Sequence, residues 1–247
     1  MKNVVIITGA SGGIGLALCK HFQEKGWFVL GTSRKASSEN TYCDAFVPAD
    51  LNALVTTPAA LQDFVDSALK AIGDRPVKAL INNAATQILG KTAALNAKDF
   101  TLSFNVNVIA PFLLTQAFLD QLVKNKGNVL NIGSVHAQAT KSEFAAYATS
   151  KTALHGLTRA LAVDLGPDVR VNTLAPAATA TPMLKAGFEG QDEAYAALAE
   201  AHPLGRISDV SEVAKAALFL CSDDASFMTG ATVYTDGGVL SRLHDPA

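Results

Sequence analysis

Residues 4–26, VVIITGASGGIGLALCKHFQEKG, contain the clearest structural signal in the chain. A β-branched run, Val4 to Ile7, passes directly into the turn TGASGGIG, and a segment with helical periodicity and a closing glycine follows. Glycines let the backbone approach a phosphate closely, and the unpaired amides at a helix start attract it. We expect a dinucleotide phosphate site from Gly9, Ser11, Gly12, Gly13, Ile14 and Gly15. The spacing departs from G-x-G-x-x-G, so an ordinary tight turn is the alternative.

Length and composition indicate that the chain forms a single large domain. Apolar residues make up 49% of the 247 residues and charged residues 17%. That balance suits an α/β domain spanning residues 1–247, whose parallel strands are covered on both faces. The net charge of -2 and the pI of about 6.2 give no basic surface of the kind that nucleic acid or an anionic membrane requires. We therefore expect neither as a partner.

The sequence also predicts the compartment. The N-terminal apolar stretch is too short for the core of a signal peptide, and no window approaches the length of a membrane span. Cys19, Cys43 and Cys221 are scattered without pairs or metal-ligand spacing, which is typical of buried thiols in a reducing compartment. We expect a cytoplasmic protein without a metal site.

A second motif lies in residues 134–151, SVHAQATKSEFAAYATSK. On a helix, the spacing of four would place Tyr147 and Lys151 on one face, where the ammonium favours the phenolate. Ser134 follows an apolar run, so its hydroxyl would stand at a strand end, within reach of a substrate oxygen. The three groups suit carbonyl reduction or alcohol oxidation. A Tyr-x-x-x-Lys pair also arises by chance on solvated helix surfaces, so the rest of the chain must support it.

The glycine turn, with Thr8, together with Ser134, Tyr147 and Lys151, resembles the short-chain dehydrogenase/reductase (SDR) family, whose common form has about the length of this chain. The resemblance covers almost the whole sequence. It implies a single-domain, Rossmann-like, doubly wound parallel sheet of seven strands with helices on both faces. It also implies hydride transfer between a nicotinamide cofactor and a carbonyl or secondary alcohol, with Tyr147 as general acid or base.

The segment after the second expected strand, 27–32, indicates which cofactor binds. It reads Ser33-Arg34-Lys35 and lacks the carboxylate that usually binds the ribose 2′-hydroxyl of NAD. Arg34 can clamp a 2′-phosphate and Ser33 adds a donor, so we expect NADP(H) to be preferred. The alternative is a pair of solvated loop charges. The resemblance adds further cofactor positions: Asp50, Leu51, Asn83, Ala84, Tyr147, Lys151, Pro176 and Thr181.

Helix signals frame the same site. A single long helix is expected over 100–122, where Asn107 matches the family's catalytic asparagine and Asn105 is the competing choice. Thr140 and Glu143 have capping-box spacing ahead of a helix that continues to residue 165. Further strands are expected at 45–47, 77–81, 127–132, 169–174 and within 229–238, and a helix over 56–72. His155, two turns beyond Tyr147, is expected to be a packed or interfacial residue.

The substrate is the least determined feature. We expect a substrate-covering segment at about 182–205. Candidate pocket residues mix polar and apolar side chains: Gln87, His136, Gln138, Phe144, Ala178, Met183 and Phe188. Among functions, a small-molecule ketone or alcohol is favoured over a 3-oxoacyl group on acyl carrier protein, because the positions that are basic in such enzymes are Asn128 and Pro167 here. A non-catalytic NADP(H) sensor is the alternative from another class. The resemblance implies a homodimer or homotetramer.

Overall fold

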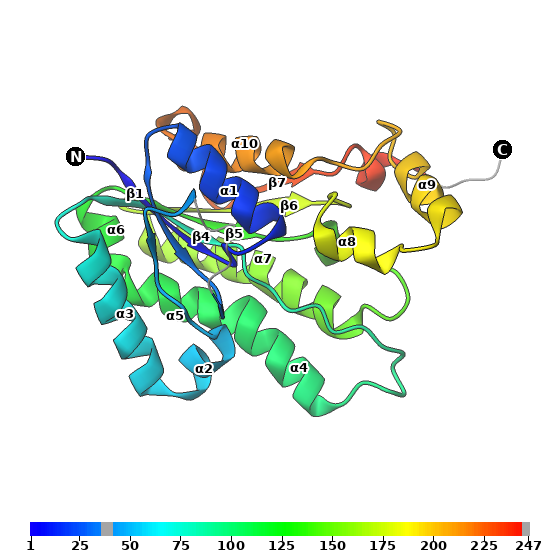
Figure 1. Ribbon diagram of the computed structural model, residues 1–247, viewed down its shortest axis with the longest axis horizontal. Coiled ribbons are helices and arrows are strands. Elements are labelled where there is room, and N and C mark those ends of the chain that lie inside the picture. Colours follow the sequence, from blue (N-terminus) through cyan, green and yellow to red (C-terminus); the bar gives the residue numbers. More distant parts are fainter. Residues whose placement is uncertain (36–41, 244–247) are drawn as a thin grey trace.

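The computed structural model describes residues 1–35 and 42–243 (Figure 1). Within these residues a parallel sheet of seven strands has the order β3-β2-β1-β4-β5-β6-β7. The strands are β1 Val4–Thr8, β2 Phe28–Thr32, β3 Ala45–Phe46, β4 Val77–Asn82, β5 Asn128–Ile132, β6 Arg170–Pro176 and β7 Thr232–Thr235. The expected seven-stranded, doubly wound architecture is confirmed.

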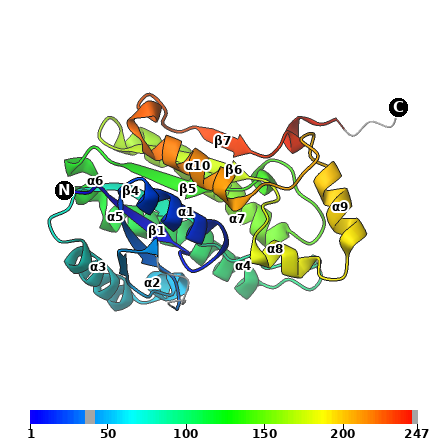
Figure 2. The ribbon, with the colours of Figure 1, turned by 45° about the horizontal axis from the view of Figure 1, so that its top comes forward.

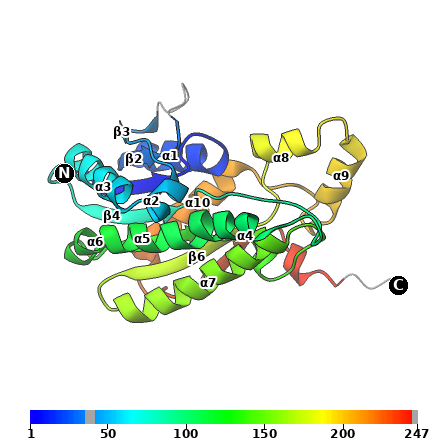
Figure 3. The ribbon, with the colours of Figure 1, turned by 90° about the horizontal axis from the view of Figure 1, so that it is seen from below.

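Helices cover both faces of the sheet. Helices α1 and α10 lie side by side on one face (Figure 2), and α3, α5, α6 and α7 cover the other (Figure 3). The helices are α1 Gly13–Glu24, α2 Leu51–Thr56, α3 Pro58–Ile72, α4 Ala97–Phe104, α5 Ala110–Ala117, α6 Leu119–Lys124, α7 Ala145–Leu165, α8 Pro182–Gly187, α9 Asp192–Glu200 and α10 Val210–Cys221.

Strand β1 shows why its sequence is continuously apolar. Val4 and Ile6 pack into the core layer beneath α3, α5 and α6, whereas Val5 and Ile7 pack into the layer beneath α1 and α10. All four side chains are fully buried. Successive side chains of a strand point to opposite faces, so a strand covered on both sides needs apolar residues at every position.

The sheet reverses its winding at β1. Strand β1 pairs with β2 on one side and with β4 on the other. In open α/β sheets, ligands bind outside the carboxyl ends of the strands at such a switch point. The glycine turn leaves β1 at this end, and residues 83–85 leave β4 beside it.

The helix expected over 100–122 is interrupted. A five-residue π-helix, Asn105–Ile109, separates α4 from α5, and a second break at Phe118 separates α5 from α6. Pro111 has no N–H and cannot complete the ladder, and the amide of Ala110 bonds instead to the carbonyl of Asn105. The interruption therefore has a local cause that the apolar periodicity conceals.

The same segment corrects the expectation about membrane spans. The run Ala97–Ala117 has 21 residues and contains an 18-residue window with a mean hydropathy of 1.2, so by length and composition alone it could cross a membrane. In the fold it contacts α2 and α7 and carries buried polar residues. A core helix of this kind meets the same criteria.

Two cap predictions also change. Helix α7 does extend to Leu165, but Glu143 has a φ of 72° and Phe144 is the N-cap without a side-chain hydrogen bond. The expected Thr140–Glu143 capping box is therefore wrong. The helix expected over 56–72 is present as α3 but begins two residues later, at Pro58, and Thr56 ends the separate short helix α2, which the Asp50 carboxylate caps.

The glycine turn offers a test of packing. A Cβ at Gly15 would collide with the carbonyl oxygen of Gly9, whereas a Cβ at Gly12 would have no heavy atom within 4 Å. Gly12 has a φ of -176°, which any residue adopts. We predict that Gly15→Ala lowers the free energy of unfolding in urea by about 1–3 kcal/mol, and that Gly12→Ala changes it by less than about 0.5 kcal/mol. Equal effects of the two variants would contradict this packing.

Candidate active site

The glycine turn forms an open cradle at the start of α1. Gly9 and Gly13 have φ values of 69° and 52°, which favour glycine. The N-cap Gly12 makes no side-chain cap, and the first turn of α1 has no acidic residue. Backbone amides are thus left for an anion, and the space above Gly12 is free of side chains. This geometry fits the pyrophosphate of a dinucleotide.

A hydrogen-bonded latch joins the ends of β1 and β4. The Thr8 hydroxyl oxygen accepts from the amides of Asn83 at 3.0 Å and Ala84 at 2.9 Å. The Asn83 side chain donates back to the carbonyl oxygens of Thr8 at 2.9 Å and Gly9 at 3.3 Å. The preceding residue, Asn82, donates to the Asn131 side chain on β5 at 2.8 Å.

Ser134, Tyr147 and Lys151 converge at the carboxyl end of β5. Ser134 begins a short 3-10 turn two residues after the strand, and its oxygen accepts from the amide of His136. Lys151 lies one turn after Tyr147 on α7; its ammonium donates to the carbonyl oxygen of Ile132 at 2.7 Å and lies 5.7 Å from the centre of the Tyr147 ring. The three side chains therefore border one space.

Burial dominates the electrostatics of this space. It raises the pKa of Tyr147, although a hydrogen bond with Ser134 opposes that shift. Burial also lowers the pKa of Lys151 to about 8, because an apolar environment disfavours the charged form of each group. The expectation that Lys151 lowers the pKa of Tyr147 is therefore not met in this structure, where Ser134 provides the lowering.

Asn107 is tied to the site and Asn105 is not. The Asn107 carboxamide accepts from the amide of Thr86 at 2.8 Å and donates to the Thr86 carbonyl and to the Ser150 hydroxyl, each at 2.9 Å. Asn105 donates to Asn52 on α2. Asn107 therefore connects the segment after β4 to the residue beside Lys151, and the π-helix turns both asparagines inward.

Only part of the expected substrate pocket lies beside Tyr147. His136 stacks on Phe144 at 4.3 Å between ring centres, and both rings meet Tyr147 edge-on. Burial lowers the pKa of His136 to about 4, with a smaller contribution from Lys141. Neutral aromatic groups thus form one wall.

The other pocket candidates are less enclosed. Gln87 and Gln138 are exposed, and Met183 is 70% exposed. Phe188 packs edge-on against Tyr195 within the 182–205 segment. Ala178 lies in the loop after β6 and borders a separate cavity beside His202 and Arg206. Their role at the site stays a prediction.

The segment that carries α8 and α9 stands beside the carboxyl ends of the strands, away from the sheet (Figures 1 and 3). Neither helix contains a fully buried residue. Thr181 caps α8, and its methyl group would lie 3.2 Å from a Cβ at Gly13. The segment is therefore anchored next to the glycine turn and again after α9, where His202 is buried and Arg242 donates to the Glu200 carbonyl, while the two helices between these points are loosely packed.

The remaining cofactor candidates occupy different environments. Arg34 is exposed, and the Ser33 hydroxyl donates to the carbonyl of Lys35. The Asp50 carboxylate accepts from two amides at the start of α2, and the Leu51 side chain is buried in the core. Asp50 thus has a capping role already, and contact of Asp50 and Leu51 with the cofactor stays a prediction.

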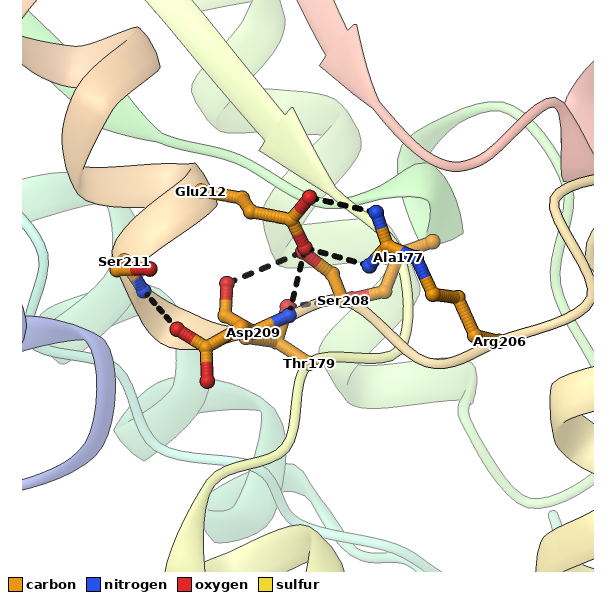
Figure 4. Close-up of polar contacts among 7 residues, drawn as sticks. All are labelled: Ala177, Thr179, Arg206, Ser208, Asp209, Ser211 and Glu212. Carbon is orange, nitrogen blue, oxygen red and sulfur yellow. Dashed lines mark hydrogen bonds and ion pairs between the residues drawn. The ribbon is translucent and has the colours of Figure 1, made fainter.

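A polar cluster that residues 206–212 form with the loop after β6 was not predicted from the sequence (Figure 4). Arg206 makes two hydrogen bonds of 2.7 Å to the Glu212 carboxylate, which also accepts from the amide of Asp209. Ser208 exchanges backbone hydrogen bonds with the 178–180 segment. The D-x-x-E spacing at 209–212 could have predicted part of this cluster, because it is the pattern of a capping box. The cluster fixes the loop that leads to Thr181.

A doubly wound parallel sheet with an anion cradle at its switch point, and Ser134, Tyr147 and Lys151 beside it, defines the class: a nicotinamide-dependent oxidoreductase of alcohols and carbonyls. The comparisons identify the family. A family model described as enoyl-(acyl carrier protein) reductase matches residues 9–240. Together with the relatives below, this match shows that the chain belongs to the short-chain dehydrogenase/reductase family.

Several known proteins resemble the chain over nearly its full length. Protein FixR of Bradyrhizobium diazoefficiens is 36% identical and covers 95% of this chain and 86% of its own. L-xylulose reductase of Bos taurus is 34% identical over 96% of both chains. Aldohexose dehydrogenase of Thermoplasma acidophilum has a TM-score of 0.92 at 29% identity, over 100% of this chain and 97% of its own. A 3-oxoacyl (acyl-carrier-protein) reductase of Agrobacterium tumefaciens with NADP bound has a TM-score of 0.85 at 30% identity, over 95% and 93%.

The cluster around Glu212 makes stability depend on pH. Hydrogen bonds from Arg206 and Asp209 lower the pKa of Glu212 from 4.5 to about 2. A depressed folded-state pKa stabilises above the unfolded value and loses that effect as the pH falls through the folded value. We predict that Glu212→Gln lowers the Tm by roughly 1–3 °C at pH 6 and that this difference shrinks between pH 4.5 and 2. Arg206→Gln should remove most of the same pH dependence. A difference that persists unchanged at pH 2 would contradict the assignment.

Proposed function

We propose that the protein is an NADP(H)-dependent reductase of a small-molecule carbonyl, or a dehydrogenase of the corresponding secondary alcohol. The observation that carries the proposal is the convergence of Ser134, Tyr147 and Lys151 at the carboxyl end of β5, which only β4 separates from β1 and its glycine turn. Asn107 supports it from a second helix through Thr86 and Ser150.

The proposed chemistry is general acid catalysis with electrostatic support. The nicotinamide supplies the hydride when bound. Ser134 donates a hydrogen bond to the carbonyl oxygen, and Tyr147 gives up its phenolic proton as negative charge develops there. The Lys151 ammonium then stabilises the phenolate and orients the nicotinamide ribose. In the oxidation direction, the Tyr147 phenolate takes the alcohol proton.

The preference for NADP(H) rests on the exposed Arg34. Its guanidinium follows β2 by two residues, without an acidic neighbour in the Ser33–Lys35 segment, and can reach a ribose 2′-phosphate. A related reductase has NADP bound in its solved structure, which supports this preference.

The substrate is proposed to be a free ketone, hydroxyketone or alcohol. Two relatives are named for sugars, L-xylulose reductase and aldohexose dehydrogenase, and the pocket wall offers the neutral His136 imidazole beside Phe144.

The 3-oxoacyl carrier-protein reductase remains the alternative enzyme, because one structural relative bears that name. The sequence argument against it loses force. Asn128 begins β5 and is buried, and Pro167 follows the end of α7, so neither borders Tyr147 within one chain.

An assembly of two or four copies is part of the proposal. Several large apolar side chains are partly exposed on the helices that carry Asn107, among them Leu102, Ile109 and Phe112, and Val163 on α7 is 82% exposed. A second copy would cover these faces, and light scattering measures the mass of the assembly.

A cytoplasmic location is also proposed. The three free thiols among the described residues suit a reducing compartment.

A screen of NADPH oxidation with ketones, sugars, steroids and acyl thioesters comes first, because it provides the substrate. We predict that Tyr147→Phe then lowers kcat at least about 100-fold while NADPH binding, measured by fluorescence, is preserved. Tyr234→Phe, in strand β7, should retain activity. Near-normal turnover by Tyr147→Phe would exclude Tyr147 as the acid, and a wild-type protein that binds NADPH but turns over no carbonyl would favour the sensor.

The cofactor preference is tested at Arg34. A charge-assisted pair of hydrogen bonds to the 2′-phosphate is worth about 1.5–3 kcal/mol, so Arg34→Ala should raise the KM for NADPH roughly 10- to 100-fold. The KM for NADH should change little. Lys25→Ala, at the other end of α1, is the control and should leave both values unchanged. Equal wild-type KM values for the two cofactors would contradict the preference.

A further inference from the structure

Two thiols face each other beside the glycine turn. Cys19 is fully buried on α1, and Cys43 is partly exposed just before β3. Their sulfur atoms lie 3.7 Å apart, within hydrogen-bond distance for thiols. A disulfide has an S–S bond of about 2.05 Å, so closure requires an approach of roughly 1.7 Å.

Contacts made by the residues on both sides of Cys43 keep its thiol close to that of Cys19. The Lys20 ammonium, next to Cys19, lies 5.7 Å from the centre of the Tyr42 ring, next to Cys43. Asp44 is fixed to Val29 on β2, because its amide donates to the Val29 carbonyl at 2.9 Å and its carboxylate accepts from the Val29 amide at 2.8 Å. The segment before β3 is therefore held against α1.

The two thiols differ in reactivity. The hydrogen bond between the two thiols lowers the pKa of Cys43, whereas the same hydrogen bond and burial raise the pKa of Cys19. The thiolate is the nucleophilic form, so the accessible Cys43 is the more reactive sulfur. Cys221 is fully enclosed, has its pKa raised to about 12 by burial, and stands apart from the pair.

We propose that Cys43 and Cys19 form a reversible, peroxide-sensitive disulfide. The Cys43 thiolate attacks the O–O bond of hydrogen peroxide, which gives a sulfenic acid and, after protonation of the leaving hydroxide, one water. The Cys19 thiol then attacks the Cys43 sulfur; the S–S bond forms, the S–OH bond breaks, and a second water leaves. Two thiols are oxidised and one peroxide is reduced. A dithiol reductant reverses the step by thiol–disulfide exchange.

The disulfide connects to the cofactor site through Gly31. The Cys43 sulfur lies so close to Gly31 that a Cβ there would collide with it, and that Cβ would also lie 2.9 Å from the methyl group of Ala10 in the glycine turn. Closure moves this sulfur towards α1 and away from the backbone that leads to Arg34. If the proposed function holds, on which this consequence rests, oxidation raises the KM for NADPH several-fold and leaves kcat unchanged.

The disulfide is tested first, on the full-length protein. After treatment with hydrogen peroxide, alkylation and peptide mass mapping should show a cross-link between the peptides of Cys19 and Cys43, the loss of two alkylatable thiols, and their return with dithiothreitol. Cys221→Ser should behave like the wild type, and Cys43→Ser should form no internal cross-link. Sulfinic acid at Cys43 without a bond to Cys19, or two unreacted thiols, would overturn the proposal.

The effect on the cofactor site is measured separately. Oxidised wild-type protein should have a raised KM for NADPH, whereas Cys43→Ser should be insensitive to peroxide. If the disulfide forms and the KM is unchanged, the connection through Gly31 is wrong. If no carbonyl is reduced at all, the proposed function fails, but peptide mapping still decides the disulfide, and NADPH binding by fluorescence replaces the KM.

Discussion

The contact between the glycine turn and the end of β4 is the constraint on which the other parts of the site depend. Gly9, Gly15 and Asn83 approach so closely that no side-chain carbon fits at either glycine. Because these positions carry no side chain, backbone amides at the turn can face an anion. The Thr8 hydroxyl oxygen accepts hydrogen bonds from the amides of Asn83 and Ala84, which joins the ends of β1 and β4. Strand β4 thereby positions Thr86, which receives Asn107. One close approach of backbones thus links the cofactor cradle to the helix behind the proposed catalytic groups.

Buried polar groups extend this linkage beneath α7. The Asn131 side chain accepts from Asn82 and donates to the Thr158 hydroxyl, which lies 2.8 Å from that of Thr173. This chain crosses β4, β5, α7 and β6, all of which border the site. A chain of hydrogen bonds between buried polar side chains favours one arrangement of the elements that carry them. The relative placement of Ser134 and Lys151 therefore rests on more than apolar packing.

The sequence predicted those features that local patterns determine. The strand, glycine turn and helix at 4–26 were recognisable because apolar continuity and glycine spacing are properties of the chain itself. The Tyr147–Lys151 pair was recognisable for the same reason, since a helical spacing of four places both on one face. The predictions that proved wrong concerned features that depend on the folded environment as well as on residue spacing. The Thr140–Glu143 spacing met the capping-box pattern, yet Glu143 adopts a positive φ. The sign of the Tyr147 pKa shift depends on burial, which no spacing reveals.

Because α8 and α9 are loosely packed, their local stability differs from the global stability of the domain. Because neither helix contains a fully buried residue, its detachment exposes little apolar surface, and the free energy of that local opening is far below that of global unfolding. The sheet and the glycine turn can stay intact while this segment moves. Changes of sequence within α8 and α9 therefore cost the rest of the molecule little, so the proposed substrate-covering segment can vary while the sheet and the glycine turn stay fixed.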